Sequence, residues 1–108
     1  MSRRRRRVGE VGERLAVYVL RRHGLDVVAR NVHVGRGELD IMAVDGGRKV
    51  VVEVRTITGS GEPLAAFGPG KAAQVSRLAR KVRAHRVDLM AIRLGPLSAD
   101  IRWVRGAV

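Results

Sequence analysis

The chain has 108 residues, with 45% hydrophobic and 3% aromatic residues, no cysteine and a formal net charge of +12 at pH 7. This length favours one domain with a core of Val, Leu, Ile and Ala, and the missing cysteines exclude a disulfide framework and a thiolate metal site. No apolar run approaches the ~20 residues of a membrane-spanning helix, so we expect a cytoplasmic protein without membrane contact.

The N-terminus carries an uninterrupted run of arginines: Arg3, Arg4, Arg5, Arg6 and Arg7. The start MSRRRRR is similar to the charged end of a signal peptide, but the next stretch, VGEVGERLA, has two glutamates where a signal peptide is apolar. We therefore predict that residues 1–7 form a flexible basic tail that contacts phosphate, and that residues 8–108 form a single folded domain.

The net charge favours a polyanionic partner, because a basic surface concentrates polyanions and speeds their association. Nucleic acid is the first such partner to consider. A coding bias toward arginine is the alternative explanation, since Lys49, Lys71 and Lys81 are the only lysines. The net charge alone therefore predicts the class of partner and gives no information about catalytic activity.

Residues 8–23 are predicted to form a helix, because apolar residues recur at helical spacing from Val8 to Val19 and Gly24 is a suitable C-terminal stop. The sequence DGG at residues 45–47 is typical of a tight turn between two strands. Three strands are predicted after the helix, at residues 25–34, 38–45 and 48–55.

The stretch TITGSGEPLAAFGPG has no period and is predicted to be a long surface loop. A second helix is predicted over residues 70–86, where Val75 and Ala79 would face inward and Arg77 outward. Two further strands are predicted at residues 87–94 and 100–104. The order helix, three strands, helix, strand, strand indicates an α/β fold.

Two acids, Asp40 and Glu53, stand inside apolar runs that are predicted to pair as a hairpin. A two-residue turn at Gly46–Gly47 would place Asp40 directly opposite Glu53, with their Cβ atoms ~4.5–5.5 Å apart. Two such charges repel, so a positive group must offset them. The candidates are Arg55, on the same face as Glu53, and a divalent cation such as Mg²⁺, which is commonly held by one or two carboxylates.

Strand alternation divides this hairpin into two faces. One predicted face is mixed and holds Asp40, Met42, Val44, Val51, Glu53 and Arg55. The other predicted face is wholly apolar and holds Leu39, Ile41, Ala43, Val50, Val52 and Val54. This regularity supports the register, because a slip of one residue would mix the two sets.

Glu13 has two possible roles on the first helix. It can be a surface glutamate near the helix N-terminus, favoured by the helix dipole and paired with an arginine. It can also turn toward the hairpin as a third acid beside Asp40 and Glu53. Three converging acids in a chain of this charge would favour a bound metal ion.

Five stretches of the sequence closely resemble the YraN family of small bacterial proteins. They are GEVGERLAVYVL, ARNVHVGRGELDIMAVD, VVVEVRT, FGPGKAAQVSRLARKV and RVDLMAI, and the resemblance covers residues 9–94. That family is similar to the Holliday-junction-resolvase-like branch of the PD-(D/E)xK nuclease superfamily. The resemblance implies a restriction-endonuclease-like αβββαβ core, in which a central mixed sheet is flanked by helices and its middle strands carry the active site.

The same resemblance implies roles for individual residues. Asp40 and Glu53 would be metal ligands, with Glu13 as the helix acid of a resolvase-type site, and Mg²⁺ or Mn²⁺ would be the cofactor. Arg55 stands at the lysine position of the superfamily. Arginine cannot act as a general base, but it can orient a nucleophile or stabilise charge in the transition state. Gln74 would match a glutamine that some members use near the site.

The sequence therefore predicts a metal-dependent endonuclease that hydrolyses phosphodiester bonds in DNA, on branched or single-stranded substrates. The alternative is a non-catalytic nucleic-acid-binding protein with a vestigial site. DNA is favoured over RNA as the partner, and resolvase-like relatives suggest a homodimer. The residues predicted to contact nucleic acid are Arg3, Arg4, Arg5, Arg6, Arg7, Arg14, Lys71, Gln74 and Arg77.

Overall fold

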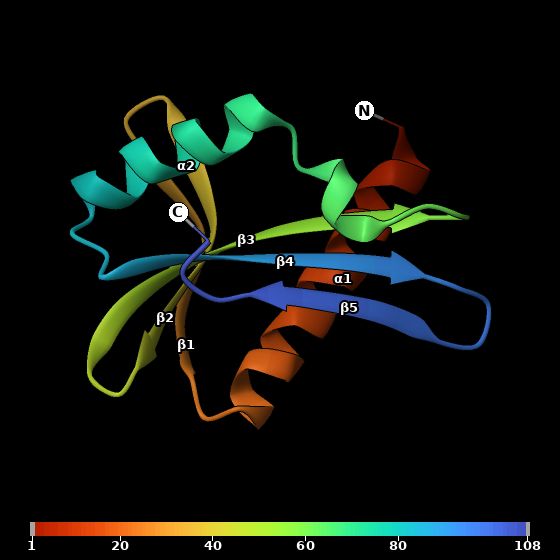
Figure 1. Cartoon of the computed structure of the whole chain (residues 1–108), viewed down its shortest axis with the longest axis horizontal. Helices are drawn as coiled ribbons and strands as arrows, with labels where there is room; N and C mark the ends of the chain where they lie inside the picture. Colours follow the sequence, from red (N-terminus) through yellow and green to blue (C-terminus); the bar gives the residue numbers. More distant parts are fainter. Residues whose placement is uncertain (1, 108) are drawn as a thin grey trace.

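Five strands form one mixed sheet between two helices in the computed structural model, which describes residues 2–107 (Figure 1). The elements are α1 (Arg3–Arg22), β1 (Asp26–Val34), β2 (Gly37–Asp45), β3 (Arg48–Thr58), the short 3₁₀ helix η1 (Pro63–Ala66), α2 (Pro69–Lys81), β4 (Arg86–Leu94) and β5 (Ala99–Val104). The strands lie in the order β1-β2-β3-β4-β5, with β3 and β4 parallel and the other neighbours antiparallel. This confirms the predicted α/β fold with its αβββαβ core.

Helix α1 begins earlier than the sequence predicted. Arg3 to Arg7, expected as a flexible tail, form its first turns. Ser2 is the N-cap, and its hydroxyl accepts a hydrogen bond from the Arg5 N–H at 3.1 Å. A serine cap and arginine's good helix propensity account for the difference.

Helix α2 ends earlier than the sequence predicted, at Lys81 instead of residue 86. Arg83 takes a left-handed conformation with φ of 57°, and the Ala84 N–H donates to the Ala79 carbonyl at 3.0 Å. This bond closes the last turn in the manner of a helix C-cap motif. The chain is then free to enter β4 at Arg86.

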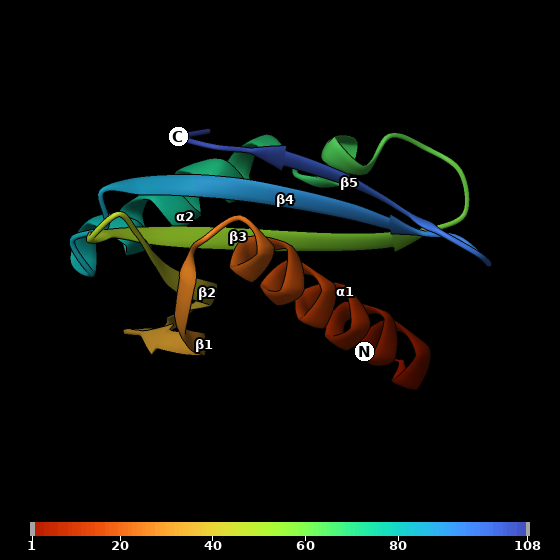
Figure 2. The ribbon, with the colours of Figure 1, turned by 90° about the horizontal axis from the view of Figure 1, so that it is seen from below.

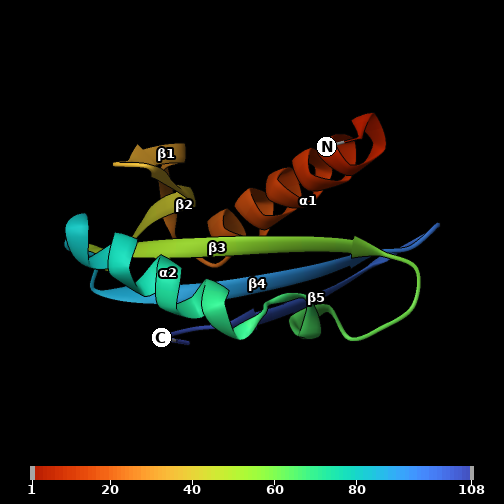
Figure 3. The ribbon, with the colours of Figure 1, turned by 90° about the horizontal axis from the view of Figure 1, so that it is seen from above.

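The two helices cover opposite faces of the sheet (Figures 2 and 3). On the α1 face, Ala16, Val17 and Leu20 pack in one core with residues from the middle strands. On the α2 face, Val75, Leu78 and Ala79 pack in a second core. The strand residues of the α1 core are Ile41, Ala43, Val50, Val52, Met90 and Ile92, and those of the α2 core are Leu39, Val51 and Val87.

These cores confirm the two predicted hairpin faces with one exception. Leu39 was predicted on the apolar face with Ile41, but it packs in the α2 core with Leu78 and Val51. The reason is that the part of β2 before Ile41 does not pair with β3, as described below, so strand alternation relative to β3 no longer holds for Leu39.

Gly12 brings α1 against β3. A Cβ atom at this position would lie 1.8 Å from Thr56 Oγ1 and 2.7 Å from Thr56 Cβ, so only glycine permits this approach. Gly9, one turn earlier on the same helix, has nothing within 4 Å of the equivalent position. Close packing against Thr56 therefore requires glycine at position 12, whereas position 9 has space for a side chain.

We expect Gly12→Ala to lower the free energy of unfolding by about 1–3 kcal/mol, because α1 must move away from Thr56. Gly9→Ala is the matched control, and it should raise stability by up to about 1 kcal/mol because alanine favours the helix. Urea unfolding followed by circular dichroism measures both changes. Equal effects in the two variants would contradict the close approach. Thr56→Ala should rescue Gly12→Ala only partly, since the Thr56 Cβ position stays occupied.

Asp88 is a fully buried carboxylate in β4 that the sequence analysis did not identify. Its oxygens accept hydrogen bonds from Arg86 Nε at 2.9 Å, Trp103 Nε1 at 3.1 Å and the Gly106 N–H at 2.9 Å. Arg86 also pairs with Asp45 at 2.8 Å, and these acids raise its pKa above the ordinary value. Asp88 therefore fixes β5 and the following turn to β4.

The sequence predicted no membrane contact. Within residues 2–107, neither helix has the length and apolar character needed to cross a lipid bilayer.

Candidate active site

The β2–β3 hairpin separates where the two acids lie. The strands pair from Asp45 and Arg48 to Ile41 and Val52, which is the predicted register. Beyond that pair the ladder ends, and β3 continues to Thr58 with β4 as its only paired strand within residues 2–107. Figures 2 and 3 show the β1–β2 hairpin turned away from the plane of β3 and β4. The second half of β3 therefore has one free edge.

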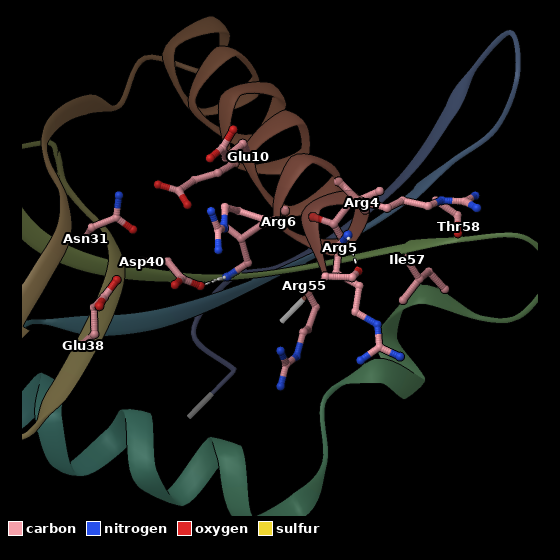
Figure 4. A pocket seen from close by; sticks show the side chains of 16 residues that line it. Arg4, Arg5, Arg6, Glu10, Asn31, Glu38, Asp40, Arg55, Ile57 and Thr58 are labelled. Atoms are coloured by element: carbon pink, nitrogen blue, oxygen red, sulfur yellow. Dashed lines mark hydrogen bonds between the residues drawn. The ribbon is translucent and has the colours of Figure 1, made fainter.

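Asp40 lies at this separation. Its Oδ2 accepts a hydrogen bond from the Val54 N–H at 2.8 Å, drawn as a dashed line in Figure 4. A backbone N–H of a strand points in the plane of the sheet, toward the place of a neighbouring strand. The Asp40 carboxylate therefore takes the position of a ladder partner beside β3, where it can be reached from either face.

Glu53 is buried under α2, with a side chain only 3% exposed. Its Oε1 lies 3.1 Å from the ammonium nitrogen of Lys71, in the first turn of α2. Its Oε2 is buried without a hydrogen-bond partner among the described residues. Arg55 was one predicted partner for Glu53, but the ion pair is made by Lys71, because α2 packs directly over this face.

The pKa of Glu53 is raised from 4.5 to about 7, mainly by burial and in second place by the nearby Asp40 carboxylate. Lys71 opposes both effects but does not cancel them. The two acids are thus close enough to repel, as the hairpin register predicted. A single ammonium leaves their combined charge incompletely balanced.

Glu13 lies on the other face of the sheet, on α1. Its Oε1 accepts a hydrogen bond from Arg30 Nε of β1 at 3.2 Å, which is the surface ion-pair role that the sequence analysis considered. Within residues 2–107, no three His, Cys, Asp or Glu side chains form a group that could hold a metal ion. Glu13 is therefore not brought together with Asp40 and Glu53 as a third ligand.

An open cleft of about 870 Å³ lies between α1 and the separated hairpin, along the free edge of β3 (Figure 4). Glu13 and Asp40 both line it. The other charged and amide residues of its lining are Arg4, Arg5, Arg6, Glu10, Asn31, Glu38 and Arg55. Asn31, with φ of 51°, and Arg30, the partner of Glu13, were not predicted as site residues. The sequence signal that could have identified these two residues is that they are adjacent polar residues inside a predicted strand.

Arg55 follows Glu53 by two residues, so the two side chains leave β3 toward the same face. Figure 4 shows the Arg55 side chain running from β3 toward α2, away from Asp40. It is exposed, and it makes no hydrogen bond or ion pair with other residues of the range 2–107. Arg55 is therefore free to contact a ligand at the edge of the site.

The residues predicted to bind nucleic acid fall into two groups. Arg3 to Arg7 and Arg14 are on α1, and Gln74 and Arg77 are exposed on α2. None of these arginines pairs with a carboxylate in the described part of the chain. Lys71 differs from both groups, because its ammonium is already engaged by Glu53.

The two hairpin acids fit a divalent cation such as Mg²⁺ or Mn²⁺. They offer two neighbouring carboxylates, and Glu53 Oε2 is a buried acceptor without a donor in the described residues. Mg²⁺ is commonly held by one or two carboxylates together with substrate phosphate, so a third protein acid is not required.

Comparison with known proteins identifies the family. A model of the uncharacterised protein family UPF0102 matches residues 12–92. A UPF0102 protein of Bordetella avium is 38% identical over 109 residues, which cover 92% of this chain and 72% of the relative. A UPF0102 protein of Symbiobacterium thermophilum is 39% identical, with 84% and 86% covered.

A solved structure shares the fold. Hjc, a Holliday junction resolvase from Archaeoglobus fulgidus, superposes with a TM-score of 0.57 at 21% identity, covering 86% of this chain and 72% of the resolvase. This likeness agrees with the predicted α/β fold. The family match spans α1 to β4, including both hairpin acids, and the chain therefore belongs to the uncharacterised protein family UPF0102, the YraN family.

Proposed function

We propose that this protein is a metal-dependent nuclease that hydrolyses phosphodiester bonds in DNA. The observation that supports the proposal most directly is the pair Asp40 and Glu53 at the separation of β2 and β3, with one buried carboxylate oxygen that lacks a donor in residues 2–107. Its structural neighbour Hjc is a Holliday junction resolvase, so branched DNA is the first substrate to test.

In this proposal Asp40 and Glu53 hold Mg²⁺ or Mn²⁺, which would supply positive charge to the substrate phosphate and assist the attack of water. Val54 fixes the Asp40 carboxylate through its N–H. Arg55 cannot remove a proton, and it instead donates hydrogen bonds to phosphate oxygens as negative charge develops on them. The arginines at the start of α1 attract the DNA backbone to the cleft.

We expect Asp40→Asn to lower cleavage of junction, flap or single-stranded DNA in Mn²⁺ by at least about 100-fold. Asparagine can still accept the Val54 N–H bond, so the fold should be retained. Asp26→Asn makes the same chemical change at an exposed acid of β1 and should leave cleavage unchanged. Equal residual cleavage in wild type and Asp40→Asn would reject the catalytic assignment.

A second candidate function is a nucleic-acid-binding protein without catalysis. The Lys71–Glu53 ion pair favours it, because an ammonium already balances part of the charge without a metal ion. This candidate predicts salt-sensitive DNA binding, with a slope set by the number of neutralised phosphates, and no Mn²⁺ binding at Asp40 and Glu53. Calorimetric titration with Mn²⁺ separates the two functions.

A further inference from the structure

Glu53, the buried acid of the site, contacts a lysine that comes from α2 instead of β3. The strand position two residues after Glu53 holds Arg55, which makes no ion pair in the range 2–107. Lys71 Nζ lies 3.1 Å from Glu53 Oε1. The cation that contacts Glu53 therefore belongs to a different element from the one that the sequence pattern indicates.

Lys71 differs from the acid it contacts in its access to solvent. Its side chain is 27% exposed, whereas that of Glu53 is 3% exposed. The lysine side chain is a flexible four-carbon stem that ends in a compact ammonium with three hydrogen-bond donors. The ammonium can therefore exchange one acceptor for another without a change in the backbone. Lys71 can thus turn outward while Glu53 stays buried.

We propose that Lys71 is the positioning cation of this site, bound to Glu53 in the metal-free protein and donating to the substrate phosphate when a divalent cation occupies Asp40 and Glu53. This inference rests on the proposed nuclease function. In this proposal the ammonium that the superfamily pattern places on β3 comes from α2. Lys71 and the metal ion therefore compete for Glu53.

Because Lys71 and the metal ion compete for Glu53, the affinity for Mn²⁺ tests the proposal without a measurement of cleavage. Lys71→Met removes the charge that occupies Glu53 Oε1, so Mn²⁺ should bind about tenfold more tightly in the absence of DNA. Calorimetric titration with Mn²⁺, at the same pH for both proteins, measures this change. Lys81→Met is the matched control, since Lys81 ends the same helix and is exposed, and it should leave Mn²⁺ affinity unchanged.

Turnover should change in the opposite direction. At saturating DNA and Mn²⁺, Lys71→Met should lower the rate of cleavage about 100-fold, with DNA affinity reduced less than about threefold. Lys71→Arg keeps a cation and should restore part of the turnover. Lys81→Met should cleave like the wild type.

Two results would overturn this role for Lys71 alone. One is weaker Mn²⁺ binding in Lys71→Met, which would mean that the lysine only supports the position of Glu53. The other is tighter Mn²⁺ binding with unchanged turnover. If the wild type neither binds Mn²⁺ nor cleaves DNA, the nuclease proposal fails and this inference fails with it.

Discussion

We expect Asp88→Ala to lower the free energy of unfolding by about 3–5 kcal/mol, a large share of the ~5–15 kcal/mol that stabilises a typical domain. The substitution removes a fully buried carboxylate and leaves the Trp103 indole N–H and the Gly106 N–H without their acceptor. Arg86 would keep only Asp45. Urea unfolding followed by far-ultraviolet circular dichroism measures the loss.

Asp100→Ala is the matched control for Asp88→Ala. Asp100 lies on β5 and also pairs with an arginine, Arg93, but it is far more exposed than Asp88. Its removal should cost much less, because water replaces the lost partner. Similar losses at the two positions would show that burial of Asp88 has no special role. Fluorescence of Trp103, the only tryptophan, should change in Asp88→Ala alone, since its indole donates to Asp88.

We expect Glu53→Gln to stabilise the metal-free protein above pH 7 by about 3 kcal/mol, and to have little effect near pH 4.5. The pKa of Glu53 is raised to about 7 in the folded protein, from 4.5. Between these values the folded state binds a proton that the unfolded state has released. The stability from this group is therefore fully present below pH 4.5 and is lost as pH rises through 7. Glutamine carries no charge, so the loss disappears.

The measurement is urea unfolding of both proteins at pH 4.5, 6 and 8 in the presence of a chelator. The quantity of interest is the difference between variant and wild type, because other groups titrate in both proteins. Glu10→Gln, at an exposed position on α1, is the control and should show no such trend. A Glu53→Gln variant that is less stable than the wild type at pH 8 would contradict the raised pKa of Glu53.

The elements of this fold could be predicted from the sequence because their signals are local. The DGG turn fixed the register of β2 and β3, and that register correctly brought Asp40 and Glu53 together. Periodicity alone could not show that the ladder ends at Ile41, since the end of a ladder depends on the twist of the whole sheet. Leu39 was misplaced for this reason.

The partners of the acids could not be predicted for a similar reason. Lys71 is eighteen residues beyond Glu53, across η1 and the start of α2, and no local pattern specifies a contact over that distance. Glu13 and Arg30 meet across two elements in the same way. Asp88 was the exception that a local signal could have revealed, because it stands two residues after Arg86 and is the only polar residue between Val87 and Ile92.

The first turns of α1 have a consequence for how the cleft is completed. They hold five adjacent arginines at the positive end of the helix, with no acidic residue in the first turn to offset them. Mutual repulsion and the helix dipole both weaken these turns, and a bound phosphate chain would remove both penalties. Arg4, Arg5 and Arg6 line the cleft, so a polyanion bound there would stabilise the first turns of α1, which form one wall of the cleft. Binding of the polyanion and folding of these helical turns would then be coupled.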